Sequence, residues 1–118
     1  MSITPRVQTV VINCTDLERQ VAFWSALLGV GEALRLPGFV FLRPQQDGGV
    51  AVALQEVPDP TPGRNRVHLD TDVDDMAEAR ARIEELDGAH LEDHEIAGFR
   101  WAVMADPEGN EFCIATHG

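Results

Sequence analysis

The sequence contains no lysine and no tyrosine, and its 118 residues include only two cysteines, Cys14 and Cys113. All nine basic residues are therefore arginines, and they face twenty acidic residues, which gives a net charge of −11 at pH 7. A surface this acidic repels phosphate backbones, so nucleic acid is excluded as the expected partner, and cationic ligands are attracted. Two cysteines are too few for a disulfide framework, so we expect reduced thiols.

Long apolar runs are also missing. No stretch approaches the roughly 20 apolar residues that a membrane span requires, and the first ten residues, MSITPRVQTV, do not place a basic flank before an apolar core. We therefore expect a cytoplasmic protein without a membrane partner. The length and the 44% hydrophobic content predict one domain, 1–118, that buries its own core.

A pattern repeats within the chain at an offset of 59 residues. One helical pattern begins at Asp16 and ends at Gly29, and a second begins at Asp75 and ends at Gly88. Strand-like segments flank both helices in the order strand, helix and three strands, as a duplicated supersecondary unit would leave them. We predict an α+β fold of paired βαβββ modules, with a curved mixed sheet around a cup and the helices on the outer face.

The turn residues and the hydrophobic runs place the boundaries. Module one is expected at about 1–56, a proline-rich linker at 57–65, and module two at about 66–118. The expected strands are 6–14, 32–36, 39–43 and 50–56 in module one, and 66–71, 90–95, 100–105 and 110–116 in module two.

Capping residues are expected at the ends of both helices. Thr15 is predicted to cap the first helix, with Glu18 reaching back in a capping box. Asp74 or Asp75 is predicted to cap the second helix, and Gly88 to end it.

Alternation along the strands predicts which side chains face the cup. Val67 and Leu69 are expected to pack under the second helix, as are Phe112 and Ile114. The expected lining is polar and consists of Thr9, Asn13, Gln55, His68, Asp70, Glu111 and Cys113. Burying an unsatisfied polar group costs about 1–3 kcal/mol, so such a lining favours a ligand cup over a structural core.

Several single residues allow two interpretations. His68, with Asp70 two positions on, either carries protons or binds a ligand, or it only lines the pocket. Cys113 is either a nucleophile or a small buried thiol. Trp101 either stacks on a ligand or packs at an edge, whereas Trp24 lies in a helical apolar stripe and is expected in the core. The remaining histidines, which are assigned no role, are His90, His94 and His117.

Three segments are distinctive: the first helix with Asp16-Leu17, Phe23-Trp24 and Leu28-Gly29, the segment 66–70 (RVHLD), and the turn 106–112 (DPEGNEF). Together they resemble the vicinal oxygen chelate superfamily of glyoxalase I, bleomycin-resistance proteins, fosfomycin-resistance enzymes and extradiol dioxygenases. The resemblance spans nearly the whole chain. It implies paired βαβββ modules, a cup for a small molecule, and a homodimer.

The resemblance also implies four positions for the ligands of a divalent metal. They fall on Thr9, Gln55, His68 and Cys113, where the family's metal enzymes usually have His at the first position and Glu at the last. Only His68 matches. Divalent metals in such sites prefer imidazole and carboxylate donors, so we expect neither a bound metal nor another cofactor.

Two functions remain open from the sequence. The first is a binding protein similar to the bleomycin-resistance branch, with a metal-free polar cup and a cationic ligand, in which Trp101 and the polar lining contact the ligand. The second is a glyoxalase-type lyase, isomerase or dioxygenase that uses a metal site rebuilt around His68. No residue is assigned a catalytic role in either case.

Overall fold

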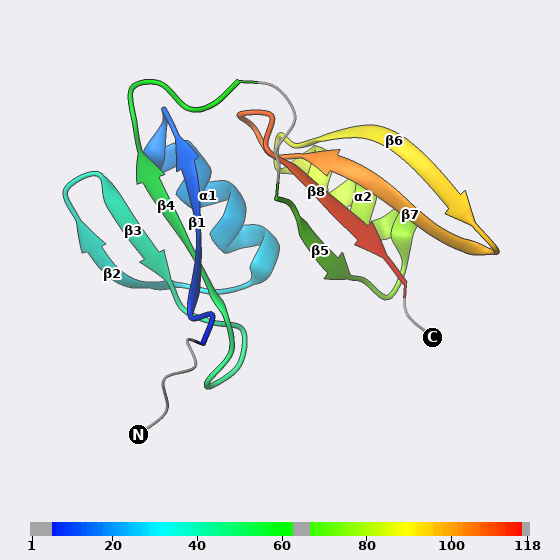
Figure 1. Cartoon of the computed structure of the whole chain (residues 1–118), viewed down its shortest axis with the longest axis horizontal. Helices are drawn as coiled ribbons and strands as arrows, with labels where there is room; N and C mark the ends of the chain where they lie inside the picture. Colours follow the sequence, from blue (N-terminus) through cyan, green and yellow to red (C-terminus); the bar gives the residue numbers. More distant parts are fainter. Residues whose placement is uncertain (1–5, 63–66, 117–118) are drawn as a thin grey trace. The chain divides into compact units, whose positions relative to one another are not determined.

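The computed structural model describes residues 6–62 and 67–116, and it divides into two compact units, Met1–Pro60 and Thr61–Gly118. Each unit has the order strand, helix and three strands, so the protein is α+β with two βαβββ modules, as predicted (Figure 1). The division falls within the proline-rich segment 57–65, of which residues 63–65 lie outside the described part, as does His117.

The first unit is a four-stranded mixed sheet with one helix on a face. Its strands are ordered β1-β4-β3-β2, with β1 and β4 parallel and the other pairs antiparallel, and α1 packs against β3 and β4. The elements are β1 (Thr9–Cys14), α1 (Leu17–Leu28), β2 (Glu32–Leu36), β3 (Phe39–Leu42) and β4 (Ala51–Glu56).

The second unit repeats this arrangement. Its strands are ordered β5-β8-β7-β6, with β5 and β8 parallel, and α2 packs against β6 and β8. The elements are β5 (Leu69–Asp72), α2 (Met76–Glu85), β6 (Ala89–Ile96), β7 (Phe99–Ala105) and β8 (Glu111–Ala115). Within the described residues, no helix is long and apolar enough to span a membrane.

The core of each unit lies between its helix and its sheet. In the first unit Trp24 is 1% exposed, as predicted, and meets the Phe23 ring edge to face at 5.2 Å. In the second unit, Ile83 of α2 is buried together with Phe112 and Ile114 of β8. The alternation predicted for β8 is therefore confirmed, because both of its large apolar side chains lie on the helix side.

The helix starts differ from the prediction at one position. The N-cap of α1 is Asp16, whose carboxylate accepts the Arg19 N–H at 3.2 Å, so Thr15 is not the cap. The helix begins one residue later than a threonine cap requires. Glu18 does not close a capping box and instead forms an ion pair with Arg35 at 2.6 Å.

In α2 the start agrees with the prediction and the end does not. Asp75 caps the helix and accepts the Glu78 N–H at 2.9 Å. After α2, Asp87 takes the left-handed conformation, with φ of 77°, although Gly88 is the glycine of the segment. In α1 Gly29 occupies that conformation with φ of 68°.

The strand predicted at 66–71 starts later than expected, and the packing predicted for Val67 is wrong. Leu69 lies opposite Phe112 in the parallel ladder, and β8 begins only one residue before Phe112. No residue of β8 therefore lies opposite Val67, which precedes β5 and is 78% exposed.

Candidate functional site

A cavity of about 210 Å³ opens on the sheet of the second unit, on the face that α2 does not cover. Alternation along β8 produces this face, because Phe112 and Ile114 point toward the helix and Glu111 and Cys113 point the other way. Val103 lies directly opposite Cys113 in the ladder. The cavity is lined by His68, Glu92, His94, Trp101, Val103, Glu111 and Cys113.

Three donor groups meet at one side of this cavity. A ring nitrogen of His68, a carboxylate oxygen of Asp70 and the sulfur of Cys113 all lie within 4.8 Å of one another. His68 Nε2 is 3.3 Å from Asp70 Oδ1, and Asp70 is paired with Cys113 in the parallel register. Thr71 Oγ donates a hydrogen bond to the carbonyl oxygen of Cys113 at 2.8 Å, which ties β5 to β8 at this point.

A second imidazole–carboxylate pair lies in the same cavity. The Nε2 atom of His94 is 2.7 Å from a carboxylate oxygen of Glu92. The His94 ring stacks on Trp101 at 5.1 Å with an interplanar angle of 18°, and Phe99 stacks on the same indole at 5.7 Å. Trp101, on the inner strand β7, therefore contacts both of these rings and also lines the cavity.

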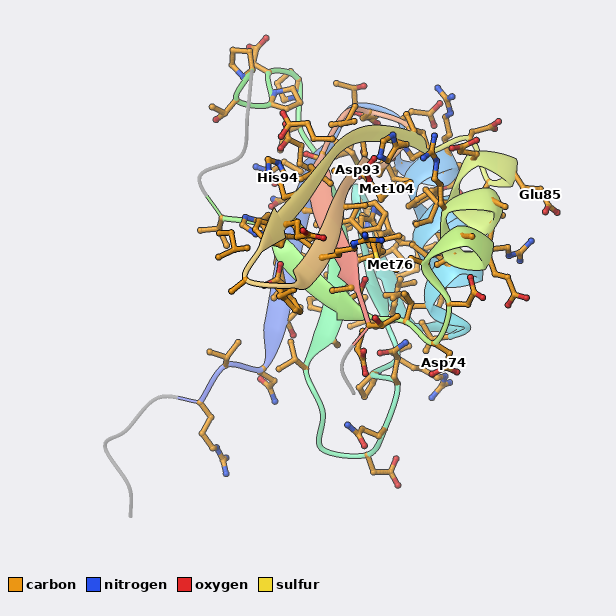
Figure 2. The ribbon with its side chains drawn as sticks, turned by 90° about the vertical axis from the view of Figure 1, so that its right-hand side faces the viewer. Asp74, Met76, Glu85, Asp93, His94 and Met104 are labelled. Carbon is orange, nitrogen blue, oxygen red and sulfur yellow. The ribbon has the colours of Figure 1, made fainter. Side chains whose placement is uncertain are left out.

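The pairing of β6 with β7 determines which histidine reaches the cavity. Glu92 is paired with Val103 and His90 with Met104, so the register shifts by one residue between them. The shift turns His90 toward the side of α2, where its Nε2 lies 2.9 Å from Asp93. This hydrogen bond holds the pKa of Asp93 below its usual value. Figure 2 shows Asp93 toward α2 and His94 on the other side of the strand.

Apart from its two histidines, the ionisable groups of oxygen and nitrogen at this cavity are all acidic. Glu92 and Glu111 line it and the Asp70 carboxylate lies beside it, whereas no arginine is among its lining residues. A flat indole and nearby carboxylates together attract an organic cation, through the ring quadrupole and through charge.

The structure places the residues predicted from the sequence in two groups. Five belong to the second unit and come together there: His68, Asp70, Trp101, Glu111 and Cys113. The other three, Thr9, Asn13 and Gln55, belong to the first unit. Asn13 and Gln55 are cross-strand partners on β1 and β4. Thr9 lines a different hollow of about 830 Å³, which also contains Phe41.

Glu92 and His94 are site residues that the sequence analysis did not assign. A signal for them exists in the tight turn between β6 and β7, where Ala97 and Gly98 both have positive φ, at 52° and 85°. A two-residue turn of this kind fixes the pairing on both sides of it. Counting outward from that turn places His94 opposite Trp101.

The donor set does not fit the divalent metal that the resemblance implies. At the four family positions, Thr9 and Gln55 offer neutral oxygens, and only His68 and Cys113 are strong donors. Asp70 adds a carboxylate beside His68 and Cys113, at a position that the resemblance does not assign. Nitrogen, oxygen and sulfur donors together suit zinc rather than magnesium or manganese.

Comparison with known proteins finds a matching family model and solved structures with a similar fold. A family model described as "Glyoxalase-like domain" matches residues 9–115, whereas no curated protein matches. Among solved structures, a glyoxalase/bleomycin resistance protein/dioxygenase family enzyme from Burkholderia phytofirmans PsJN is similar, with 22% identity and a TM-score of 0.73 over 95% of this chain and 98% of that one.

Two further structures show the same fold. A glyoxalase-related enzyme from Fulvimarina pelagi has 20% identity and a TM-score of 0.75, over 97% of this chain and 89% of that one. A mutant of the fosfomycin resistance protein FosX from Listeria monocytogenes, in complex with Mn(II) and a dihydroxypropylphosphonic acid, has 16% identity and a TM-score of 0.77, over 99% of this chain and 93% of that one. At these identities the likeness concerns the fold.

Proposed function

Because the chain belongs to the glyoxalase-like domain family of the vicinal oxygen chelate superfamily, we propose that it is a metal-independent binding protein for a small organic cation. The observation that carries the proposal is the cavity of about 210 Å³ in the second unit, which is lined by the Trp101 indole and by the carboxylates of Glu92 and Glu111. Binding of this kind requires affinity and no chemical step.

The expected affinity follows from the groups that line the cavity. A cation over an indole gains about 0.5–2 kcal/mol, depending on how far it is desolvated. A unit cation about 4 Å from a carboxylate gains about 1 kcal/mol in water, and more where the site is partly desolvated. One ring contact and one carboxylate contact together favour a cation over its neutral analogue by at least tenfold, since 1.4 kcal/mol corresponds to a factor of about ten.

A matched pair of ligands tests this proposal. N-methylquinolinium is a planar cation at pH 7, and quinoline is a neutral molecule of nearly the same shape. We expect calorimetry to show that the cation binds at least tenfold more tightly. Glu111→Gln should remove most of this preference while leaving quinoline binding unchanged, and Trp101→Leu should weaken both ligands.

Glu85→Gln provides the control, because it removes one negative charge from the exposed face of α2, away from the cavity (Figure 2). This variant should bind both ligands as the parent does. Equal affinity of the parent for the cation and the neutral molecule would contradict the proposal, and so would an equal loss of affinity in Glu85→Gln and Glu111→Gln.

A second candidate function is supported by the meeting of His68, Asp70 and Cys113. In this alternative the three residues hold a zinc-like cation, and the protein is a glyoxalase-type lyase, isomerase or dioxygenase. Protein purified without a histidine tag would then contain nearly one equivalent of metal, and His68→Ala would lose it. Under the metal-independent proposal the metal content is low, and cation binding is the same with and without EDTA.

We further propose that the protein is a cytoplasmic homodimer. Large apolar side chains are exposed on strands of both units, among them Leu34, Leu36, Leu91 and Ile96, and a partner surface would cover such residues. Neither cysteine forms a disulfide, which suits a reducing compartment. Light scattering should give twice the chain mass of 12.9 kDa, and a monomer at micromolar concentration would contradict the dimer.

A further inference from the structure

We propose that the end of the β6–β7 hairpin holds an apolar arm of the ligand, so that the protein prefers a cation that carries a hydrocarbon chain about 7 Å long over a small cation. The inference rests on the proposed cation site and extends it beyond the cavity. The residues that carry it are Phe99 and Ile96, which lie outside the lining of the cavity.

The hairpin extends past the strand that pairs with it. β8 ends at Ala115, which is the ladder partner of Trp101. Within the described residues, the part of β7 before Trp101 therefore has no partner in β8, and Figure 1 shows the end of the hairpin beyond the end of β8. At this end Phe99 is 44% exposed and Ile96 is 67% exposed. Both side chains are therefore accessible to a bound molecule.

The two faces of the hairpin end differ in character. Ile96 is the cross-strand partner of Phe99, and Glu95 is the partner of Arg100. Because successive residues of a strand point to opposite faces, the first pair lies on one face and the second pair on the other. Arg100 Nε donates a hydrogen bond to a carboxylate oxygen of Glu95 at 2.7 Å, so this face presents an ion pair. The opposite face presents two apolar side chains.

The apolar face is the one that continues into the cavity. Phe99 and Trp101 are two residues apart on β7 and share a face, and the centroids of their rings lie 5.7 Å apart. Trp101 lines the cavity, and Phe99 continues the apolar surface outward from it. Two residues of a strand span about 7 Å, which is roughly the length of a hexyl chain. A ligand whose charged ring lies in the cavity can therefore place an apolar arm over Phe99 and Ile96.

A second copy of the chain is the other occupant that would cover these side chains, because exposed apolar residues also suit a dimer interface. The contact between Phe99 and Trp101, a cavity residue, favours the ligand. Leu34 and Leu36 of β2 belong to the first unit, are 51% and 48% exposed, and have no such connection to the cavity. The β2 side chains are therefore assigned to the dimer, and the hairpin end to the arm of the ligand.

The test compares N-methylquinolinium with N-hexylquinolinium by calorimetry at pH 8. Full burial of a methylene group strengthens binding by about fourfold, and an arm on an open surface buries about half of its area, which corresponds to about twofold per group. The hexyl compound has five more methylene groups and should bind about 30-fold more tightly. Phe99→Thr should lower its affinity at least fivefold, Ile96→Thr should lower it at least threefold, and both variants should bind the methyl compound as the parent does.

Leu36→Thr provides the matched control, because Leu36 has nearly the same exposure as Phe99 but belongs to the first unit. This variant should bind both cations as the parent does. Quinoline and 2-hexylquinoline test the arm without the charge. The hexyl group should give about the same gain in this neutral pair, since its burial does not depend on the charge of the ring. Phe99→Thr should reduce the gain in the neutral pair as well.

Failure of the inference and failure of the proposed function give different results. Equal binding of N-methylquinolinium and quinoline contradicts the cation site, and the neutral pair then still decides whether the hairpin end holds an arm. A hexyl gain below fivefold in the neutral pair, or an equal loss in Leu36→Thr and Phe99→Thr, overturns the inference whether or not the cation is preferred. Light scattering that shows a dimeric parent and a monomeric Phe99→Thr protein also overturns it, because a second copy would then cover the hairpin end.

Discussion

Substitutions at two adjacent residues after α2 should change the stability of the protein in opposite directions: Gly88→Ala should lower it, and Asp87→Gly should raise it. A Cβ atom added to Gly88 would lie 2.6 Å from Cγ2 of Ile83 and 2.8 Å from the carbonyl oxygen of Ala105. Both neighbours are buried and belong to the packed contact between α2 and the sheet. Gly88→Ala must therefore displace backbone or core atoms, whereas Asp87→Gly relieves a residue whose φ is 77°.

The magnitudes follow from the two mechanisms. Overpacking costs about 1–3 kcal/mol, and replacing a glycine gains only about 0.4–1 kcal/mol from the unfolded chain, so Gly88→Ala should lose about 1–2 kcal/mol. A residue other than glycine in the left-handed region stores roughly 1 kcal/mol or more, and the extra flexibility of glycine offsets about half of this gain. Asp87→Gly should therefore be more stable by about 0.5 kcal/mol.

Urea unfolding followed by far-ultraviolet circular dichroism measures both effects, provided that the slope of the transition is unchanged. The reasoning is refuted if Gly88→Ala is as stable as the parent, or if Asp87→Gly is less stable. The second variant is the more decisive of the two. If Gly88 were the left-handed residue that ends the helix, as the repeated pattern suggests, glycine at Asp87 would only add flexibility and would destabilise the protein.

Two further stability measurements test other parts of the second unit. Asp106 is 3% exposed and accepts the Glu108 and Asn110 N–H groups at 3.0 and 2.9 Å. Asp106→Ala should lower the free energy of unfolding by about 2–4 kcal/mol, because two or more hydrogen bonds to a charged acceptor are lost. A loss below 1 kcal/mol in urea unfolding would contradict this. The pKa of Asp93 is lowered in the folded protein, mainly by the hydrogen bond with His90. Ionised Asp93 therefore stabilises the fold at pH values above its pKa in the unfolded chain, which is near 4. This contribution disappears as the pH falls through the pKa of Asp93 in the folded protein. Asp93→Asn should therefore be less stable than the parent at pH 5 and equal to it near pH 2, and a constant difference across this range would exclude the linkage.

The helical spacing of apolar residues and the alternation of side chains along the strands were sufficient to predict much of the fold. The apolar stripe around Trp24 and the alternation of Phe112 and Ile114 each have one energetically favourable orientation, because a slip of one residue would bury polar groups. The same argument failed at Val67, since alternation says which way a strand residue points but not where the ladder begins. The first residue of β5 is determined instead by its partner strand β8, which starts at Glu111.

The part of the site on β6 was missed for a related reason. Simple alternation puts His90, Glu92 and His94 on one face, yet the register shift before Glu92 separates His90 from the other two. A bulge of this kind leaves little trace in the sequence, because it inserts one residue without changing the composition of the strand. Only pairing with β7, which places His94 against Trp101, distinguishes the two histidines.

Equivalent positions in the two units show why the chemistry concentrates in the second. The parallel ladders match β1 to β5 and β4 to β8, and the positions of His68, Asp70, Glu111 and Cys113 then correspond to Thr9, Val11, Ala51 and Ala53. Every ionisable group of the second set is replaced by a neutral one in the first. Because the second set is carried by strands of one sheet, hydrogen-bonded register fixes the spacing of its groups. The groups of the proposed cation site therefore all belong to the second unit and need no donor from the first.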